Sequence, residues 1–176
     1  MCSSDLLGLH YPSYELIIVN DDSKDDTLER LIAAFQLYSV PPAVRTVLPT
    51  VPVRGYYRSR IHAKLFVIDK ENGGKADALN AALNAARSPY VLAVDADTIL
   101  DPDALLRLSR PFSLGEPVAA VGGALRVANG CRVENGRVVE TRVHSQWMTG
   151  CQSVEYLRAL DRKSTRLNSS HITISY

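Results

Sequence analysis

Residues 91–97 read VLAVDAD, an apolar run that ends in two aspartates, Asp95 and Asp97. In an extended chain, side chains at positions i and i+2 point to the same face, so these two carboxylates can converge on one point. Converging carboxylates repel each other unless a cation lies between them. Their oxygens suit hard divalent ions such as Mg²⁺ or Mn²⁺, which in turn hold phosphates. The stretch therefore predicts a strand that ends at a metal and phosphate site, although such triplets also arise by chance.

The composition is that of an ordinary globular protein. The 176 residues are enough for one domain with a real core, and 46% are apolar and 22% charged. A net charge of +1 gives no reason to expect nucleic acid as a partner. Three cysteines at irregular spacing form neither a disulfide framework nor a zinc site, so a reduced, cytosolic-facing domain is expected. No apolar run approaches the roughly 18 residues of a membrane span, and no signal peptide opens the chain.

The two ends of the chain break from this pattern. Residues 161–171, DRKSTRLNSSH, can be written as a common sequencing-library adapter read in frame, and residues 1–6 as the reverse complement of the beginning of that adapter. We therefore expect residues 1–6 and 161–176 to be technical additions, the latter disordered, and residues 7–160 to be a partial domain. The alternative is a natural polar tail, and the codons of the gene decide between the two.

Alternating strand and helix patterns fill the part between these ends. Apolar runs predict strands at residues 14–20, 90–94, 118–121 and 124–128, a further strand within 43–52, and another within 61–69. Helical spacing predicts helices at residues 27–38, 76–87, 104–109 and 154–160. This alternation is typical of the α/β class, with a mainly parallel sheet covered by helices on both faces.

Acidic residues follow two of the predicted strands. Asp21 and Asp22 come after the first strand, and Asp95 and Asp97 come after the strand at 90–94. Ligands of open α/β sheets bind at the carboxyl ends of the strands, so both clusters face one crevice if the two strands are neighbours. This arrangement suits a nucleotide: one cluster accepts hydrogen bonds from the base or ribose, and the other holds a metal on the diphosphate.

Other interpretations of these polar segments remain open. Taken alone, residues 21–23 are more often a helix N-cap than a binding site, with Ser23 or Asp25 as the capping residue. Residues 73–75, Gly-Gly-Lys, open a helix whose backbone N–H groups attract phosphate, and Lys75 adds a charge there. The segment is not a P-loop, because the first glycine is missing and Ala76 replaces the Ser or Thr. Lys75 alone is equally consistent with an exposed surface lysine.

Three ordered motifs together resemble the family 2 glycosyltransferases. Residues 15–27, ELIIVNDDSKDDT, resemble that family's ELIVVDDGSTDDT, and residues 72–80, NGGKADALN, resemble its NGGKAxALN. Residues 90–98, with PDAL at 102–105, resemble its DxD strand. Order and spacing agree over about residues 11–160. With QSVEY at 152–156, the chain is similar to membrane synthases of polysaccharides such as poly-N-acetylglucosamine, hyaluronan or cellulose.

The resemblance implies a GT-A (Rossmann-like) fold and an inverting transfer from a nucleoside-diphosphate sugar, expected to be a UDP-sugar, to a glycan or lipid acceptor. Asp22, with Asp21, would contact the nucleoside, and Lys75 would lie near the diphosphate. Asp95 and Asp97 would hold the donor and Mg²⁺ or Mn²⁺, with Asp97 the better metal ligand. The metal would neutralise charge on the leaving diphosphate.

Several features of the family have no match here. These are a first strand with a PxYNE segment before Tyr11, the later acidic motif that supplies the general base, the QxxRW motif and the membrane helices. Asn20 and Ser23 also replace commoner residues, but neither change removes a carboxylate. We therefore expect a soluble fragment that cannot turn over by itself, from a parent enzyme at the cytoplasmic face of the plasma membrane. Detecting sugar transfer by the 176-residue chain would refute this expectation.

Two other function classes compete with this interpretation. One is a non-catalytic nucleotide-binding module, which would lack the later acidic motif in the longer gene. The other is a receiver-like phosphoacceptor domain, which would need a lone aspartate at a strand end and a late lysine. The pair Asp95 and Asp97, together with the Gly-Gly-Lys segment at 73–75, argues against the receiver.

Overall fold

The computed structural model describes residues 6–114, 118–123, 131–134, 137–140 and 173–175. The chain divides into two compact units. The first unit is Pro12–Val91, and the second combines Met1–Tyr11 with Leu92–Tyr176. The strand expected at 124–128 and the helix expected at 154–160 lie outside the described residues.

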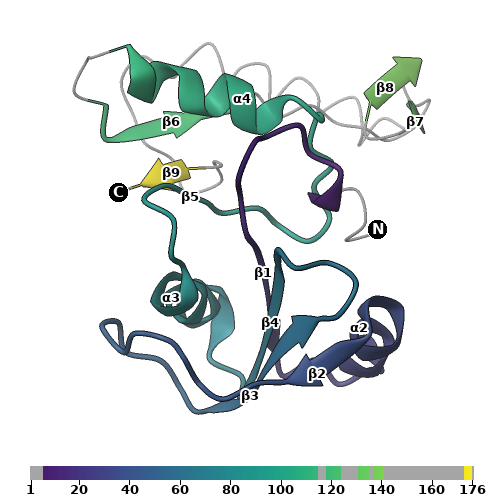
Figure 1. Ribbon diagram of the computed structural model, residues 1–176, viewed down its shortest axis with the longest axis vertical. Helices are drawn as coiled ribbons and strands as arrows, with labels where there is room; N and C mark the ends of the chain where they lie inside the picture. Colours follow the sequence, from purple (N-terminus) through teal and green to yellow (C-terminus); the bar gives the residue numbers. More distant parts are fainter. Residues whose placement is uncertain (1–5, 115–117, 124–130, 135–136, 141–172, 176) are drawn as a thin grey trace, which may run out of the picture. The chain divides into compact units, whose positions relative to one another are not determined.

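A four-stranded sheet forms the centre of the first unit. Its strands follow the order β1 (Leu16–Asp21), β4 (Leu65–Lys70), β3 (Val53–Ser59) and β2 (Leu37–Ser39). Helices α2 (Thr27–Phe35) and α3 (Gly74–Ala85) lie on opposite sides of it (Figure 1). The predicted α/β class is therefore confirmed. The sheet is mixed rather than mainly parallel, because only β1 and β4 pair in parallel while β3 joins β4, and β2 joins β3, antiparallel.

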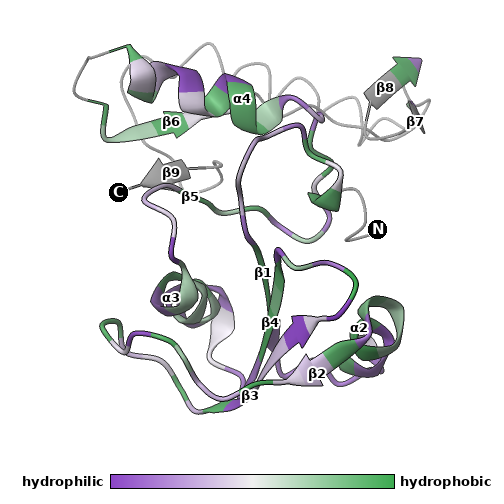
Figure 2. Ribbon diagram, viewed as in Figure 1, coloured by the Kyte–Doolittle hydropathy of each residue, from purple (hydrophilic) through white to green (hydrophobic). Residues whose placement is uncertain are grey.

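The core of the first unit is built on β4. Leu65, Val67 and Ile68 are almost completely buried, and β1 and β4 are the hydrophobic centre of the sheet in Figure 2. β4 has a neighbouring strand at each edge, and a helix lies on each side of the sheet. A strand in this position is buried on both faces, so its sequence shows a continuous apolar run instead of alternation.

Helix α2 ends earlier than its spacing predicts. The expected helix ran from residue 27 to residue 38, but the observed helix ends at Phe35, and Gln36 adopts a left-handed conformation with φ 47°. Leu37 then begins β2 and pairs with Ser59. The Ser59 hydroxyl donates a hydrogen bond of 2.7 Å to the carbonyl of Phe35. The apolar spacing typical of a helix continues past Phe35. The helix nevertheless ends there, because Leu37 is buried as the first residue of β2.

The prediction of a strand within residues 43–52 is wrong. The segment is instead held to α3 by the buried side chain of Asn84. Its Oδ1 accepts hydrogen bonds from the N–H groups of Val47 (3.2 Å) and Leu48 (2.9 Å), and its Nδ2 donates to the Leu48 carbonyl (2.8 Å). Prolines at both ends of the segment lack the N–H that a ladder requires. The strand lies further along the chain, in β3.

The second unit contains shorter elements. They are β5 (Val91–Leu92) at the boundary between the units, α4 (Ala104–Ser109), the 3₁₀ helix η1 (Arg110–Ser113), β6 (Ala120–Gly122), β7 (Arg132–Glu134), β8 (Arg137–Glu140) and β9 (Thr173–Ser175). β6 pairs antiparallel with β9, and β7 with β8.

The predicted strands of this unit that fall in described residues differ from their predicted bounds, whereas its helix does not. Helix α4 has its predicted bounds, and the strand expected at 118–121 appears as β6. The strand expected at 90–94 is reduced to the two residues of β5. β9 falls within the closing segment 161–176, whose origin as an adapter stays a prediction. Within the described ranges, no helix is both long enough and apolar enough to cross a membrane.

Candidate functional site

Asp21, the last residue of β1, reaches the start of α3. Its Oδ1 accepts a hydrogen bond from the N–H of Gly73 (3.0 Å), and its Oδ2 accepts one from the N–H of Gly74 (2.8 Å). Gly74 has φ 81°, which a residue with a side chain tolerates poorly. Helix N-termini attract anions. The helix start that the sequence predicts as a phosphate site is thus bonded to a carboxylate of the protein itself.

Lys70, the last residue of β4, neutralises the charge of the Asp21 carboxylate. Its side chain is 0% exposed, and its Nζ lies 2.6 Å from Asp21 Oδ1 and 2.7 Å from Asp77 Oδ1. Burial favours the neutral form of Lys70, but the two carboxylates outweigh burial and raise its pKa. Burial likewise acts to raise the pKa of Asp21, yet the hydrogen bonds from Lys70, Gly73 and Gly74 lower it overall. Both groups are therefore held in their charged forms.

Asp22 carries the other predicted contact to a ligand. Its backbone is left-handed, with φ 61°, which is uncommon for a residue other than glycine. Its carboxylate bonds to Lys24, and its Oδ1 accepts a hydrogen bond of 2.6 Å from Arg54 Nη1. Lys24, followed by Arg54, lowers the pKa of Asp22. The carboxylate is thus charged and oriented by two cations.

Arg54, from β3, joins Asp22 to the end of β4. Its Nε and Nη2 bond to the two carboxylate oxygens of Asp69, at 2.9 and 3.0 Å, in the paired geometry that makes Arg–carboxylate contacts strong. Asp69, and to a smaller extent Asp22, raises the pKa of Arg54. Asp69 also accepts a hydrogen bond of 2.8 Å from the buried Asn20. We call this group the strand-end cluster; its members are Asp21, Asp22, Arg54, Asp69, Lys70 and Asp77.

Four of the six members of this cluster, Arg54, Asp69, Lys70 and Asp77, escaped the sequence analysis. Asp69 and Lys70 follow an apolar run just as Asp21 and Asp22 do, and the parallel pairing of β1 with β4 places Asp21 opposite Lys70. That repeated pattern is a signal that could have found them. Arg54 gives no local signal, because its place depends on the unexpected strand β3.

Of the two residues predicted as candidates to cap helix α2, Asp25 bonds to the start of the helix and Ser23 does not. The carboxylate of Asp25 accepts hydrogen bonds from the backbone N–H (3.2 Å) and the hydroxyl (2.6 Å) of Thr27, the first residue of α2. The Ser23 N–H instead donates to the Asn20 side chain (3.3 Å). Asp25 thus holds the helix start, and Asp21 and Asp22 serve the strand-end cluster.

The remaining predicted site residues are exposed. Lys75 follows Gly74 at the start of α3. Asp95 and Asp97 belong to the second unit and lie on a turn in which the Thr98 N–H donates to the Asp95 carbonyl (3.0 Å). In the described part of the chain, no group of three or more His, Cys, Asp and Glu side chains is arranged to hold a metal ion. Two exposed carboxylates nevertheless fit Mg²⁺ or Mn²⁺, which take their other ligands from water and phosphate.

These features define an α/β domain whose charged residues gather at the carboxyl ends of parallel strands. The sequence model of glycosyl transferase family 2 matches residues 2–166, and the chain belongs to this family of glycosyltransferases. It is 32% identical over 126 residues to the poly-beta-1,6-N-acetyl-D-glucosamine synthase of Staphylococcus epidermidis. The protein of the same name from Staphylococcus aureus (strain COL) gives the same identity over the same length. Each alignment covers 72% of this chain and 25% of the relative, so the chain spans about a quarter of the length of these relatives. No solved structure matches.

Proposed function

We propose that this chain binds a nucleoside-diphosphate sugar, as the donor-binding part of a glycosyltransferase that extends a glycan. The observation that carries the proposal is the carboxylate of Asp22, held by Arg54 and Lys24 at the carboxyl end of β1. This is the end of an α/β sheet where ligands bind. Family membership supplies the class of ligand.

In this proposal the residues of the first unit have separate roles. Asp22 accepts a hydrogen bond from the nucleoside, and Lys24 and Arg54 keep it charged and in place. Asp21 acts indirectly, because its hydrogen bonds to Gly73 and Gly74 fix the start of α3. Lys75 follows those glycines and offers its charge to the diphosphate.

Asp95 and Asp97 hold Mg²⁺ or Mn²⁺ in this proposal, with Asp97 the main ligand and Asp95 shared between the metal and the donor. The ion supplies positive charge that stabilises the leaving diphosphate, and the transfer inverts the sugar configuration. The exposure of both side chains on their turn leaves them accessible to an ion and a phosphate.

The names of the relatives narrow the choice of sugar donor and of acceptor. They are synthases of a poly-N-acetylglucosamine polymer. We accordingly propose UDP-N-acetylglucosamine as the donor and a growing glycan as the acceptor, with the complete enzyme acting at the cytoplasmic face of the membrane.

Calorimetric titration of UDP-N-acetylglucosamine into the 176-residue chain with Mn²⁺ tests the proposal. We expect saturable binding that UDP competes away, and a loss of affinity of about tenfold or more in Asp22→Ala, equivalent to about 1.4 kcal/mol. Asp25→Ala is the matched control, since Asp25 lies in the same turn and bonds only to the start of α2 among the contacts described above. Absence of binding, or equal affinities in Asp22→Ala and the unaltered chain, would overturn the proposal.

A further inference from the structure

A cavity lies at the end of β1 and β4 that is opposite to the strand-end cluster. Its volume is about 250 Å³, and all its lining residues belong to the first unit. Glu15, which directly precedes β1, and Leu65, the first residue of β4, both line it. Apolar side chains that include Val40, Val44 and Phe66 form much of its wall.

The wall of this cavity is fixed by hydrogen bonds. Asn84 holds residues 45–48, which directly follow the lining residue Val44, through both its side chain and its carbonyl, which accepts a hydrogen bond from the Arg45 N–H (2.9 Å). On the other side, Glu15 Oε1 accepts hydrogen bonds from the N–H groups of Arg87 (2.7 Å) and Ser88 (3.0 Å). The cavity therefore has a defined shape before any ligand enters.

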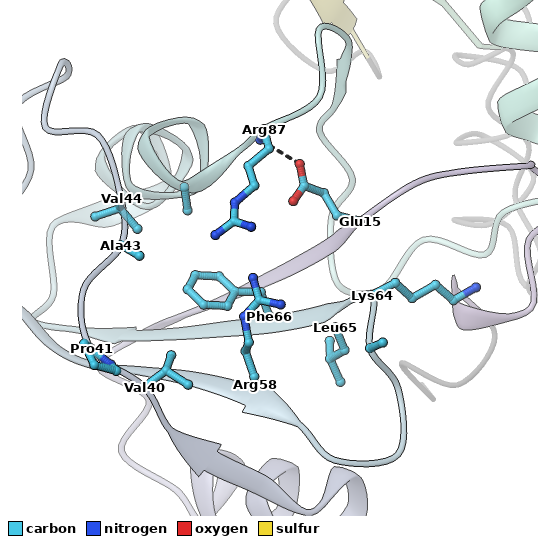
Figure 3. A pocket seen from close by; sticks show the side chains of 12 residues that line it. Glu15, Val40, Pro41, Ala43, Val44, Arg58, Lys64, Leu65, Phe66 and Arg87 are labelled. Carbon is cyan, nitrogen blue, oxygen red and sulfur yellow. Dashed lines mark hydrogen bonds between the residues drawn. The ribbon is translucent and has the colours of Figure 1, made fainter.

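Two guanidinium groups give the cavity a positive charge. Figure 3 shows the side chains of Arg58 and Arg87 directed toward the space beside the Phe66 ring. The Arg58 guanidinium lies 5.5 Å from the centre of that ring. Neither guanidinium lies within ion-pair distance of a carboxylate among the residues that the structure describes. Glu15 is the one acidic residue of the lining. The charges of Arg58, Arg87 and Glu15 therefore sum to one net positive charge.

Lys64 does not add to this charge at the cavity. Its Nζ donates to the Tyr14 hydroxyl (2.6 Å) and lies 4.0 Å from the centre of the Tyr14 ring. Figure 3 shows its side chain extending away from the cavity. The charge that a ligand meets is therefore that of Arg58 and Arg87.

We propose that this cavity binds a small aromatic carboxylate. A single negative charge matches the net charge of the lining, and a planar carboxylate can bond to the donors of a guanidinium in pairs. A flat ring packs against Phe66 and the neighbouring aliphatic side chains. The volume of about 250 Å³ lies below the roughly 300–1,000 Å³ of pockets for drug-sized ligands, so it suits one ring rather than a nucleotide.

The test uses benzoate as the probe and benzamide as its uncharged counterpart of the same shape. Each is titrated into the ¹⁵N- and ¹³C-labelled full chain, and chemical shifts of Phe66, Val40 and Val44 are followed by NMR. We expect saturable shifts with benzoate and affinity for benzamide lower by about tenfold or more. Arg58→Gln and Arg87→Gln should each weaken benzoate binding several-fold. Arg45→Gln is the control, because its exposed side chain does not line the cavity.

Each remaining outcome contradicts the proposal. Equal affinities for benzoate and benzamide would show an apolar cavity without anion selection, and absence of shifts with either would show no site. Equal shifts with inorganic phosphate would show anion binding without the aromatic preference. Unchanged amide spectra away from the cavity identify arginine variants that remain folded. The proposal does not depend on nucleotide binding, which is measured separately with UDP.

Discussion

At the end of β1, the carboxylate of Asp21 lies between the buried ammonium group of Lys70 and the first amides of α3, whereas after β5 the carboxylates of Asp95 and Asp97 are exposed on a turn. Both pairs of aspartates follow apolar runs and look alike in sequence. The difference lies in what the fold places opposite each pair. A buried lysine and a helix start give Asp21 a structural role, while the side chains of Asp95 and Asp97 are exposed to solvent.

Removing the buried ammonium group should have the largest effect. Lys70→Met leaves Asp21 and Asp77 facing each other without a counter-charge, and breaking a buried pair in this way costs about 3–5 kcal/mol. Asp21 and Asp77 keep 21% and 18% of their side chains exposed, so we expect the lower end, about 3 kcal/mol. Urea unfolding measures it. Lys75→Met, which removes an exposed lysine of the same region, is the control and should change stability by less than about 0.5 kcal/mol.

The start of α3 offers the next largest effect. Gly74→Ala forces a side chain into a left-handed conformation and should cost about 1–2 kcal/mol. The control is Gly123→Ala, where φ is not left-handed and the added methyl group meets Leu108 at an ordinary 3.7 Å. Thermal unfolding of both variants gives the comparison. Equal losses of stability in the two variants would contradict the assigned cost of the left-handed backbone at Gly74.

Acid should weaken the first unit through Asp21. Its folded-state pKa lies below the ordinary 3.8, so in acid the unfolded chain binds the proton first. The stability that the charged form contributes is present above about pH 4 and is lost as the pH falls through the folded-state pKa. Urea midpoints between pH 6 and pH 2.5 follow this loss. Asp21→Asn should flatten the profile in this window, and an identical profile in that variant would contradict the assignment.

The stability that Lys70 contributes should be lost at high pH, not at low pH. The pKa of Lys70 is raised above its ordinary 10.5, so its contribution is complete below that pH and is lost as the pH rises through the folded-state value. Urea midpoints between pH 9 and pH 11.5 should fall in the unaltered chain. The fall should be shallower in Lys70→Met, where no ammonium group remains at this position. Equally steep falls would show that another group is responsible.

Neutralising the exposed carboxylates should have the smallest effect on stability. Asp95→Asn and Asp97→Asn alter side chains on a solvent-exposed turn, and such changes usually stay within about 0.5 kcal/mol. Thermal unfolding without metal checks this. A loss as large as that of Lys70→Met would show that Asp95 or Asp97 supports the fold as Asp21 does.

The sequence predicts elements best where one local pattern decides them. Residues 101–103, Asp-Pro-Asp, correctly mark the start of α4, and the first apolar run correctly marks β1. The missed strand β3 contains Gly55 and Arg58, and no local periodicity reveals it, since its pairing partners lie elsewhere in the chain. The site follows the same rule: Asp21 and Asp22 can be found from their strand, whereas Arg54 reaches them only through β3.

The most direct test of the contrast between the two strand ends is the Mn²⁺ dependence of UDP affinity in two variants. Calorimetry of Asp97→Asn and Asp21→Asn, each with and without Mn²⁺, separates metal holding from structural support. We predict that Asp97→Asn keeps its stability but loses the enhancement of affinity by Mn²⁺, while Asp21→Asn loses stability and keeps that enhancement in the fraction that remains folded. UDP binding that is independent of metal and unaffected by Asp97→Asn would contradict the account.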